Sequence, residues 1–208
     1  APGAKSLKVV AVKIFSGHLS TGTLESQAPI ATTTPAYTRS QFEPSSTAEN
    51  LFQDDMESGT GKWTWAVPFT SLTTNVWHSW SHAWIASASG TTNGSLTAAS
   101  PLDLSNYAGP AIRFTNAYRM ASANDKGTLE VSTDGVNWAA LATYTGSTFH
   151  WSTEQVDLSA YGETANVRLR FRAVSQSSLL WYLDDVYLNA WPAVKSASTR
   201  ACRVCPSR

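Results

Sequence analysis

The stretch NVRLRFRAV, residues 166–174, alternates apolar and basic side chains without interruption. Three apolar residues occupy one set of alternate positions, namely Val167, Leu169 and Phe171. Three arginines occupy the other set, namely Arg168, Arg170 and Arg172. Since successive side chains of a β-strand point to opposite faces of a sheet, this pattern predicts a strand with its apolar side in a core and its arginines on the surface.

Segments of the same kind continue on both sides of this stretch. GTLEVS (127–132) and WAALATY (138–144) flank an Asp-Gly pair at 134–135, which is typical of a type I′ hairpin turn. A further long strand candidate is LLWYLDDVYLNAW (179–191). Residues 50–192 contain many such segments and no clear helical period. The sequence therefore predicts an all-β fold, a two-sheet antiparallel jelly-roll sandwich.

One short phrase occurs twice, as DLSNY at residues 103–107 and as DLSAY at residues 157–161. The repeat is either a duplicated binding site or one turn used at two places in the fold. An Asp side chain can accept hydrogen bonds from the backbone of its own turn, and an alternating strand follows each copy. This favours two similar corners of one sandwich over two sites.

By composition the chain has three parts, an N-terminal arm and leash (1–49), the sandwich (50–192) and a basic tail (193–208). The arm contains KSLKVVAVKIF (5–15), a strand candidate that is apolar on both faces through Leu7, Val9, Val10, Val12 and Ile14. Eighteen of the 34 residues from 16 to 49 are Ser, Thr, Pro or Gly, which is typical of a linker. The strand is expected either to open the main domain or to enter the sheet of a neighbouring molecule.

The formal net charge is zero, but it is unevenly distributed. Residues 50–192 carry 7 Lys or Arg and 12 Asp or Glu, a net charge of −5, whereas residues 193–208 carry four basic residues and no acid. An acidic body with basic ends favours head-to-tail contact between copies. The sequence has neither a basic patch with interleaved aromatics nor an apolar run long enough to cross a bilayer, which argues against a nucleic-acid partner and a membrane span.

Two features indicate a secreted protein at the cell surface or in the extracellular space. The sequence starts APGAKS, as expected after removal of a signal peptide. Cys202 and Cys205 are too few for a zinc site made of cysteine alone and lie outside any βαβ context. A disulfide is therefore expected, either between these two residues or between subunits.

Six phrases follow one another in an order that marks a family. They are FQDDMESG (52–59), a tryptophan-rich stretch, LTAASPLDLSNY (96–107), GTLEVSTDGVNW (127–138), the second DLSxY phrase with NVRLRF, and WYLDDVYL (181–188). Over about residues 50–190 the chain resembles the MAM-like jelly-roll domains of secreted bacterial proteins, including those appended to extracellular proteases. It also resembles the wider jelly-roll fold of carbohydrate-binding modules. The resemblance implies a β-sandwich used in adhesion, binding or assembly, with one structural calcium ion near the first and last strands.

Carried over by position, the calcium ligands implied by this resemblance are Asp55, Glu57, Asp184 and Asp185. Calcium prefers several hard oxygen ligands at once, and two adjacent acids in an apolar strand are costly unless they are paired or coordinated. We expect Asp55 and Glu57 to point to the same side of a strand, with Met56 turned to the core. The alternative is ordinary caps and ion pairs, for instance with Arg168 or Arg172.

Tryptophan on a jelly-roll face can stack on sugar rings, and an outward arginine row can bind an acidic sugar. The candidate glycan contacts are Trp63, Trp65, Trp80, Arg168 and Arg170. The alternative is core packing, because a Trp side chain buries a large area, and the family pattern favours the core for Trp77 and Trp84. The arginine row can equally be a solvated face matched by Glu on the next strand. His78 and His82 would share a metal only on a helix and are expected to be surface residues.

No catalytic motif is present: the sequence has neither G-x-S-x-G nor H-E-x-x-H, so the protein is not expected to be an enzyme. The function favoured by the arm is a secreted structural subunit that self-assembles into an extracellular fibre or surface appendage, by donating its N-terminal strand to a neighbouring jelly roll. The alternative is a carbohydrate-binding or adhesive module that uses exposed Trp and Arg on a sandwich face. A monomeric domain whose arm folds back onto itself is a third possibility.

Overall fold

Strands make up most of the part of the chain that the structure describes. The computed structural model describes residues 12–15, 18–21, 47–148 and 150–193 of the 208. In this described part the only helical element is a single 3₁₀ turn, η1 (Ser159–Tyr161). The described part also contains no helix with the length and apolarity needed to span a membrane.

The chain divides into two units, Ala1–Phe42 and Glu43–Arg208. In the first unit, β1 (Val12–Phe15) and β2 (His18–Thr21) form an antiparallel hairpin. Of the predicted assembly arm, Val12 and Ile14 therefore lie in β1 and pair within their own chain. The other residues of that arm, Leu7, Val9 and Val10, lie outside the described residues, as do Cys202 and Cys205.

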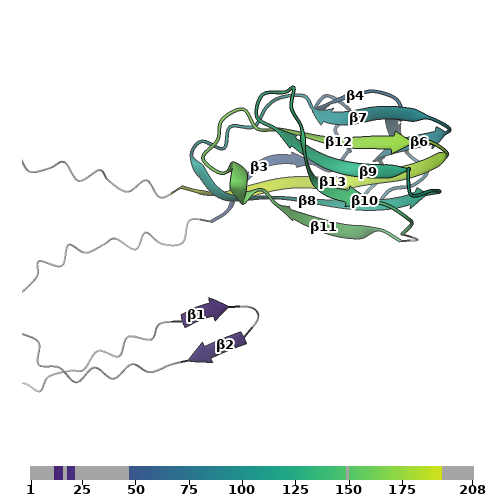
Figure 1. Ribbon diagram of the computed structural model, residues 1–208. Coiled ribbons are helices and arrows are strands. Elements are labelled where there is room, and N and C mark those ends of the chain that lie inside the picture. Colours follow the sequence, from purple (N-terminus) through teal and green to yellow (C-terminus); the bar gives the residue numbers. More distant parts are fainter. Residues whose placement is uncertain (1–11, 16–17, 22–46, 149, 194–208) are drawn as a thin grey trace, which may run out of the picture. The chain divides into compact units, whose positions relative to one another are not determined.

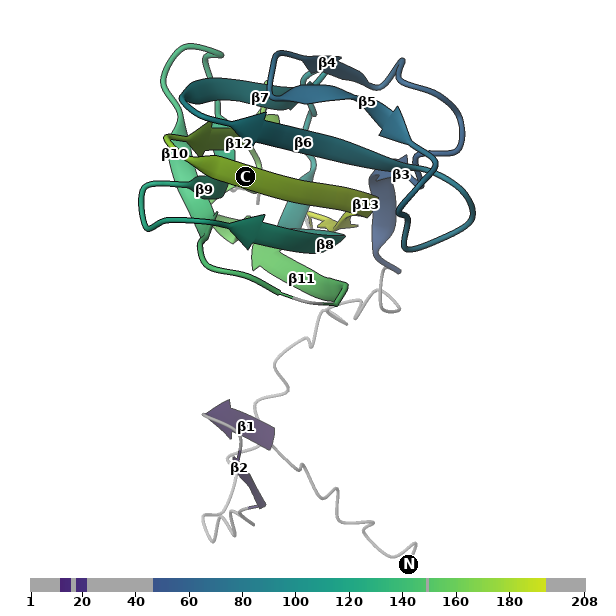
Figure 2. The ribbon, with the colours of Figure 1, turned by 90° about the vertical axis from the view of Figure 1, so that its right-hand side faces the viewer.

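The second unit is a sandwich of two antiparallel sheets, as predicted (Figure 1). The five-stranded sheet has the order β10 (Ala139–Tyr144), β9 (Lys126–Ser132), β12 (Arg168–Ser175), β7 (Thr92–Ala98) and β4 (Trp63–Trp65). The larger sheet has the order β11 (Ser152–Asp157), β8 (Tyr107–Met120), β13 (Ser178–Pro192), β6 (Ala83–Ser89) and β5 (Phe69–Thr73), and β3 (Glu49–Asp54) also pairs with β13. Figure 2 looks onto this larger sheet, with β5, β6, β13, β8 and β11 following one another in that order.

The alternating stretch that predicts the fold is β12, the central strand of the five-stranded sheet. Its apolar residues Leu169 and Phe171 are buried between the sheets. There Phe171 packs edge-on against Trp181 of β13, with ring centroids 5.8 Å apart. The packing leaves no space at Gly127, where a Cβ atom would lie 2.6 Å from the Trp181 ring. The two sheets therefore meet through large aromatic side chains around a position that only glycine can occupy.

Both copies of the repeated phrase form corners at one end of the sandwich. Asp103 Oδ1 accepts a hydrogen bond from the Ser105 backbone N–H at 2.9 Å, and Asp157 Oδ1 accepts one from Ser159 at 2.9 Å. Contacts with the Ser105 and Ser159 side chains, followed by these backbone hydrogen bonds, lower the pKa of both carboxyls. The leucine that follows each aspartate is fully buried, so each corner anchors the strand that comes after it.

The predicted hairpin between β9 and β10 forms, but its turn is not type I′. Six residues, 133–138, separate the two strands. Asp134 organises them, because its Oδ1 accepts the backbone N–H groups of Val136 and Asn137, both at 2.8 Å. The carboxylate holds a wider loop than the two-residue turn that the Asp-Gly pair suggests.

Candidate functional site: an aromatic groove on the six-stranded sheet

The outer face of the larger sheet carries the side chains that alternate with its core. Along β13, Trp181 points inward, and Leu180 and Tyr182 lie on the opposite face. Across the β8–β13 pair, Leu180 lies opposite Arg119 and Tyr182 opposite Ala117. Since directly opposed residues share a face, β8 and β13 together place an aromatic ring and an arginine on the outside of the sandwich.

These side chains form one wall of a hollow of about 340 Å³, which we call the aromatic groove. Its lining comes from β8, β13 and two connecting segments, and comprises Val76, Ala117, Tyr118, Arg119, Ser147, Thr148, His150, Trp151, Leu180 and Tyr182. The Trp151 and Tyr182 rings lie 6.1 Å apart at a tilt of 53°. Thr148 bonds to β8 through its backbone N–H, which donates to Tyr118 O at 2.8 Å, so the segment carrying Trp151 is fixed against the sheet.

The β5–β6 loop, residues 74–82, borders the same groove. Val76 contributes to the lining, and the His78 ring packs against Trp151 with centroids 5.7 Å apart. The loop lies over Asp184, which is fully buried although it follows the outward-facing Tyr182 by two residues. The loop therefore covers one end of the sheet and leaves the aromatic groove beside it.

A β-bulge at Asp184 and Asp185 explains why two acids interrupt an apolar strand. β13 uses three steps from Asp184 to Tyr187 where β8 uses two, and Asp185 has a φ of 51°. The extra residue reverses the alternation, so that Val186 and not Asp185 returns to the core. The sequence pattern does not reveal this reversal.

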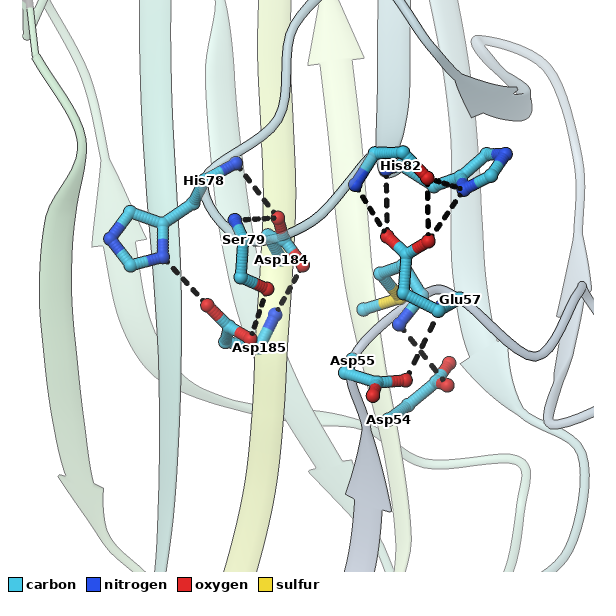
Figure 3. A network of polar contacts seen from close by, with 10 residues as sticks. Asp54, Asp55, Glu57, His78, Ser79, His82, Asp184 and Asp185 are labelled. Atoms are coloured by element: carbon cyan, nitrogen blue, oxygen red, sulfur yellow. Dashed lines mark hydrogen bonds and ion pairs between the residues drawn. The ribbon is translucent and has the colours of Figure 1, made fainter.

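The bulge carboxylates hold the β5–β6 loop in place (Figure 3). Asp184 Oδ2 accepts the backbone N–H groups of His78 at 2.9 Å and Ser79 at 3.1 Å. Asp185 Oδ2 lies 2.6 Å from His78 Nδ1, and its Oδ1 accepts the Ser79 hydroxyl at 2.7 Å. Burial raises the pKa of Asp184 to about 6, although the two backbone donors oppose that shift.

Glu57 holds the other end of this loop. Its Oε1 accepts the backbone N–H groups of Ser81 at 2.9 Å and His82 at 2.8 Å, and its Oε2 accepts the Ser81 hydroxyl at 2.7 Å. His82 Nδ1 lies 2.9 Å from the same Oε2. The contact with His82, followed by those with Ser81, lowers the pKa of Glu57 to about 2.

The residues implied as calcium ligands do not form one coordination sphere. Among the residues that the structure describes, no group of three or more His, Cys, Asp or Glu side chains is arranged to hold a metal ion. β3 ends before Asp55, and Met56 turns into the core as expected, but Glu57, Asp184 and Asp185 all accept hydrogen bonds from the β5–β6 loop. The arrangement fits a loop clamp better than a calcium site, and the ion stays a prediction.

The structure separates the tryptophans predicted to contact glycans. Trp63 is only 4% exposed and donates its indole N–H to the buried Asp54 at 2.6 Å, so its assignment as a glycan contact is wrong. Trp65 is 43% exposed but packs against Trp84, with centroids 5.1 Å apart. Trp80 is 80% exposed and lines a separate hollow of about 330 Å³ with Asp55, Glu57 and Ser81. Trp84 is buried as expected, whereas Trp77, expected in the core, is 42% exposed because it belongs to the β5–β6 loop.

The predicted arginine contacts lie on the five-stranded sheet, away from the aromatic groove. Arg168, Arg170 and Arg172 alternate with the buried residues of β12. Arg170 Nε donates to Glu130 Oε2 at 2.5 Å, and its guanidinium lies 4.0 Å from the centre of the Trp138 ring. Glu130 on the adjacent strand also pairs with Arg172 at 3.6 Å. This is the solvated, Glu-matched face that was the alternative to an acidic-sugar site.

None of the predicted glycan contacts lines the aromatic groove. Its outward aromatic residues Trp151 and Tyr182 were missed because they lie in separate segments and form no local motif. The one signal available in the sequence was the alternation of β13, which places Tyr182 on the outer face of the strand because the preceding residue, Trp181, is buried on the inner face. His78 and His82 are surface residues as expected, but each contacts a carboxylate.

Comparison with known proteins places the fold. No family model matches the chain. A carbohydrate-binding module of family 61, solved with β-1,4-galactotriose, is 14% identical and superposes with a TM-score of 0.52 over 67% of this chain and 97% of that one. A family 22 module from Clostridium thermocellum Xyn10B is 11% identical, with a TM-score of 0.52 over 71% and 96% of the two chains. The chain has the jelly-roll fold of carbohydrate-binding modules. A cleaved adhesin domain of Lys-gingipain shares this fold at 15% identity and a TM-score of 0.50, over 66% of this chain and 96% of the domain.

One curated protein matches by sequence. Bacillopeptidase F of Bacillus subtilis (strain 168) is 33% identical over 89 residues, which is 41% of this chain and 6% of that protein. The match is too short to assign a family. The likeness to MAM-like domains stays a prediction.

Proposed function

We propose that this protein is a non-catalytic glycan-binding module and that the aromatic groove is its binding site. The observation that carries the proposal is the open groove of about 340 Å³ in which Trp151 and Tyr182 lie side by side on the outside of a jelly roll. Binding sites for small ligands are typically concave, mostly apolar and aromatic, with a few polar groups that fix orientation. The two half-buried rings supply apolar area for a sugar ring, and the Ser147 and Thr148 hydroxyls and Arg119 supply polar partners.

The comparisons support this function at the level of the fold. The superposed family 61 module was solved with a galactotriose, and another superposed structure is a xylan-binding domain of family 22, with a TM-score of 0.51 at 11% identity over 70% of this chain and 97% of that one. At such low sequence identity the shared fold does not indicate which sugar this chain binds. An extracellular location suits a module that binds polysaccharides and is part of the proposal.

The fibre-subunit function stays a prediction that no structural observation favours. Strand donation needs an arm that pairs with another molecule. In the described part of the arm, β1 pairs with β2 of its own chain. A glycan-binding module needs no such exchange.

The proposal is tested by affinity electrophoresis through gels that contain xylan, β-1,4-galactan or polygalacturonate. We expect at least one polysaccharide to retard the protein, and Trp151→Ala and Tyr182→Ala each to weaken binding about tenfold or more, which is the loss of about 1.4 kcal/mol of ring contact. Trp138→Ala is the matched control, because Trp138 lies under Arg170 on the other sheet. Thermal melting of each variant checks that it is folded.

If Trp138→Ala abolishes retardation and the two groove variants do not, the binding site lies on the five-stranded sheet. That result would contradict the assignment of the site to the aromatic groove. A folded protein that migrates unretarded through all three gels would contradict the function itself.

A further inference from the structure

The charged and polar groups that line the aromatic groove are basic or neutral. Arg119 is exposed at its wall, His150 is exposed beside it, and Ser147 and Thr148 contribute hydroxyls. Among the described residues that line the groove there is no Asp or Glu. A ligand in the groove therefore meets positive charge and hydrogen-bond donors.

Arg119 differs from two of the three arginines of β12 on the opposite sheet. Arg170 and Arg172 are both paired with Glu130. Arg119 forms no ion pair with any described residue. Its backbone is paired on both sides, with Leu180 of β13 on one side and with Ser147 through a β-bridge on the other. Its backbone is thus held rigidly while its guanidinium is left open to a partner.

The two acidic residues of the β13 bulge, on the same sheet as Arg119, are already engaged. Asp185 contacts His78 and the Ser79 hydroxyl, and the buried Asp184 accepts backbone donors from the same loop (Figure 3). Both carboxylates turn toward the β5–β6 loop. They do not neutralise Arg119.

Resting on the proposed function, we propose that the ligand is an acidic glycan, in which a uronate carboxylate pairs with Arg119 while a neighbouring sugar ring packs on Trp151 and Tyr182. The planar guanidinium presents parallel N–H donors that match a carboxylate in a bidentate fashion. The sandwich itself carries a net charge of −5 over residues 50–192. General attraction of a polyanion cannot supply the preference, so Arg119 must supply it locally.

The experiment uses pairs of sugars that differ by a carboxylate. One pair is xylotetraose and xylotetraose with a single 4-O-methylglucuronate branch, and the other is β-1,4-galactotetraose and tetragalacturonate. By isothermal titration calorimetry, we expect the acidic member of at least one pair to bind about tenfold more tightly than the neutral one. Arg119→Gln should bring the two affinities within about twofold of each other, chiefly by weakening binding of the acidic member, since a neutral amide cannot form an ion pair with a carboxylate.

Arg113→Gln is the matched control. Arg113 lies on the same outward face of β8, opposite Tyr187 and outside the groove. Six residues of strand place it ~20 Å from Arg119, beyond the screening length of ~8 Å at physiological salt. This variant should keep the preference for the acidic sugar.

The outcomes separate the two proposals. Equal affinity for the neutral and acidic members, with no effect of Arg119→Gln, would overturn the acidic-glycan inference and leave the glycan-binding function standing. No binding of any of the four sugars by the folded protein would overturn both. A sulfated galactotetraose that binds more tightly than tetragalacturonate would overturn the uronate assignment.

Discussion

At the scale of single residues, Asp184 shows how the protein positions the loop beside the aromatic groove. Its carboxylate lies on the outer face of β13, two residues after Tyr182, yet the β5–β6 loop buries it completely. Its two backbone donors, His78 and Ser79, fix the loop, and the His78 ring contacts Trp151 of the groove. A buried acid thus supports the loop that borders the aromatic groove.

The pKa of Asp184 is a direct test of this burial. Its carboxyl should titrate near pH 6 in the folded protein, well above its ordinary value of 3.8. Because the folded pKa lies above the unfolded one, the charged form carries a cost above pH 6, and this cost disappears as the pH falls from about 6 to 3.8. The ¹³C chemical shift of the carboxyl, followed by NMR against pH, measures the midpoint.

Asp103 is the control for this titration, since hydrogen bonds from Ser105 lower its pKa below 3.8. A bound calcium ion would keep Asp184 charged and lower the midpoint of its titration. In the loop-clamp account this carboxylate binds backbone N–H groups and no ion, so we expect millimolar calcium to leave the midpoint unchanged. A midpoint at or below 3.8, or a fall of the midpoint on adding calcium, would contradict the loop-clamp account.

At the scale of elements, the two DLSxY corners stabilise the fold by anchoring the strands that follow them. In each corner the Asp carboxylate accepts a turn N–H, and the next residue, Leu104 or Leu158, is buried. The corners also join each other, because Leu102 and Val167 exchange backbone hydrogen bonds at 2.7 and 2.8 Å. The strands β8 and β12 that follow are thereby anchored at the same end of the sandwich.

Removal of one corner carboxylate should therefore affect stability and leave glycan binding unchanged. We expect Asp157→Ala to lower the free energy of unfolding through loss of its hydrogen bonds to Ser159. Asp157→Asn keeps a side-chain oxygen acceptor and should lose less. Urea unfolding measures both variants. An Asp157→Ala protein of unchanged stability but weakened glycan affinity would instead indicate a duplicated binding site.

The same scale shows how far the sequence predicts the structure. The alternation in residues 166–174 was sufficient to predict strand β12 and its buried face, because one set of alternate side chains is apolar and the other is basic. In β4 the two indoles of Trp-Thr-Trp share one face, and only packing on Asp54 and Trp84 distinguishes buried Trp63 from half-exposed Trp65. The aromatic groove depends on the register between β8 and β13 and on a separate segment that carries Trp151. Such long-range pairing leaves no local signal in the chain.

At the scale of the whole sandwich, its two outer faces differ in what they leave unpaired. The five-stranded sheet presents Arg170 and Arg172, which are both paired with Glu130, and Arg170 also stacks on Trp138. The six-stranded sheet presents rings and Arg119 around an open groove. The face with unpaired binding groups is the one expected to bind a ligand.

The most direct test of this account is an NMR titration that maps where a sugar binds. Backbone amide shifts are recorded while the tetrasaccharide that binds most tightly in calorimetry is added. The account predicts that the largest shifts fall on residues 117–119, 147–148, 150–151 and 180–182, around the aromatic groove. Largest shifts on residues 168–172, the arginine face of the other sheet, would contradict it.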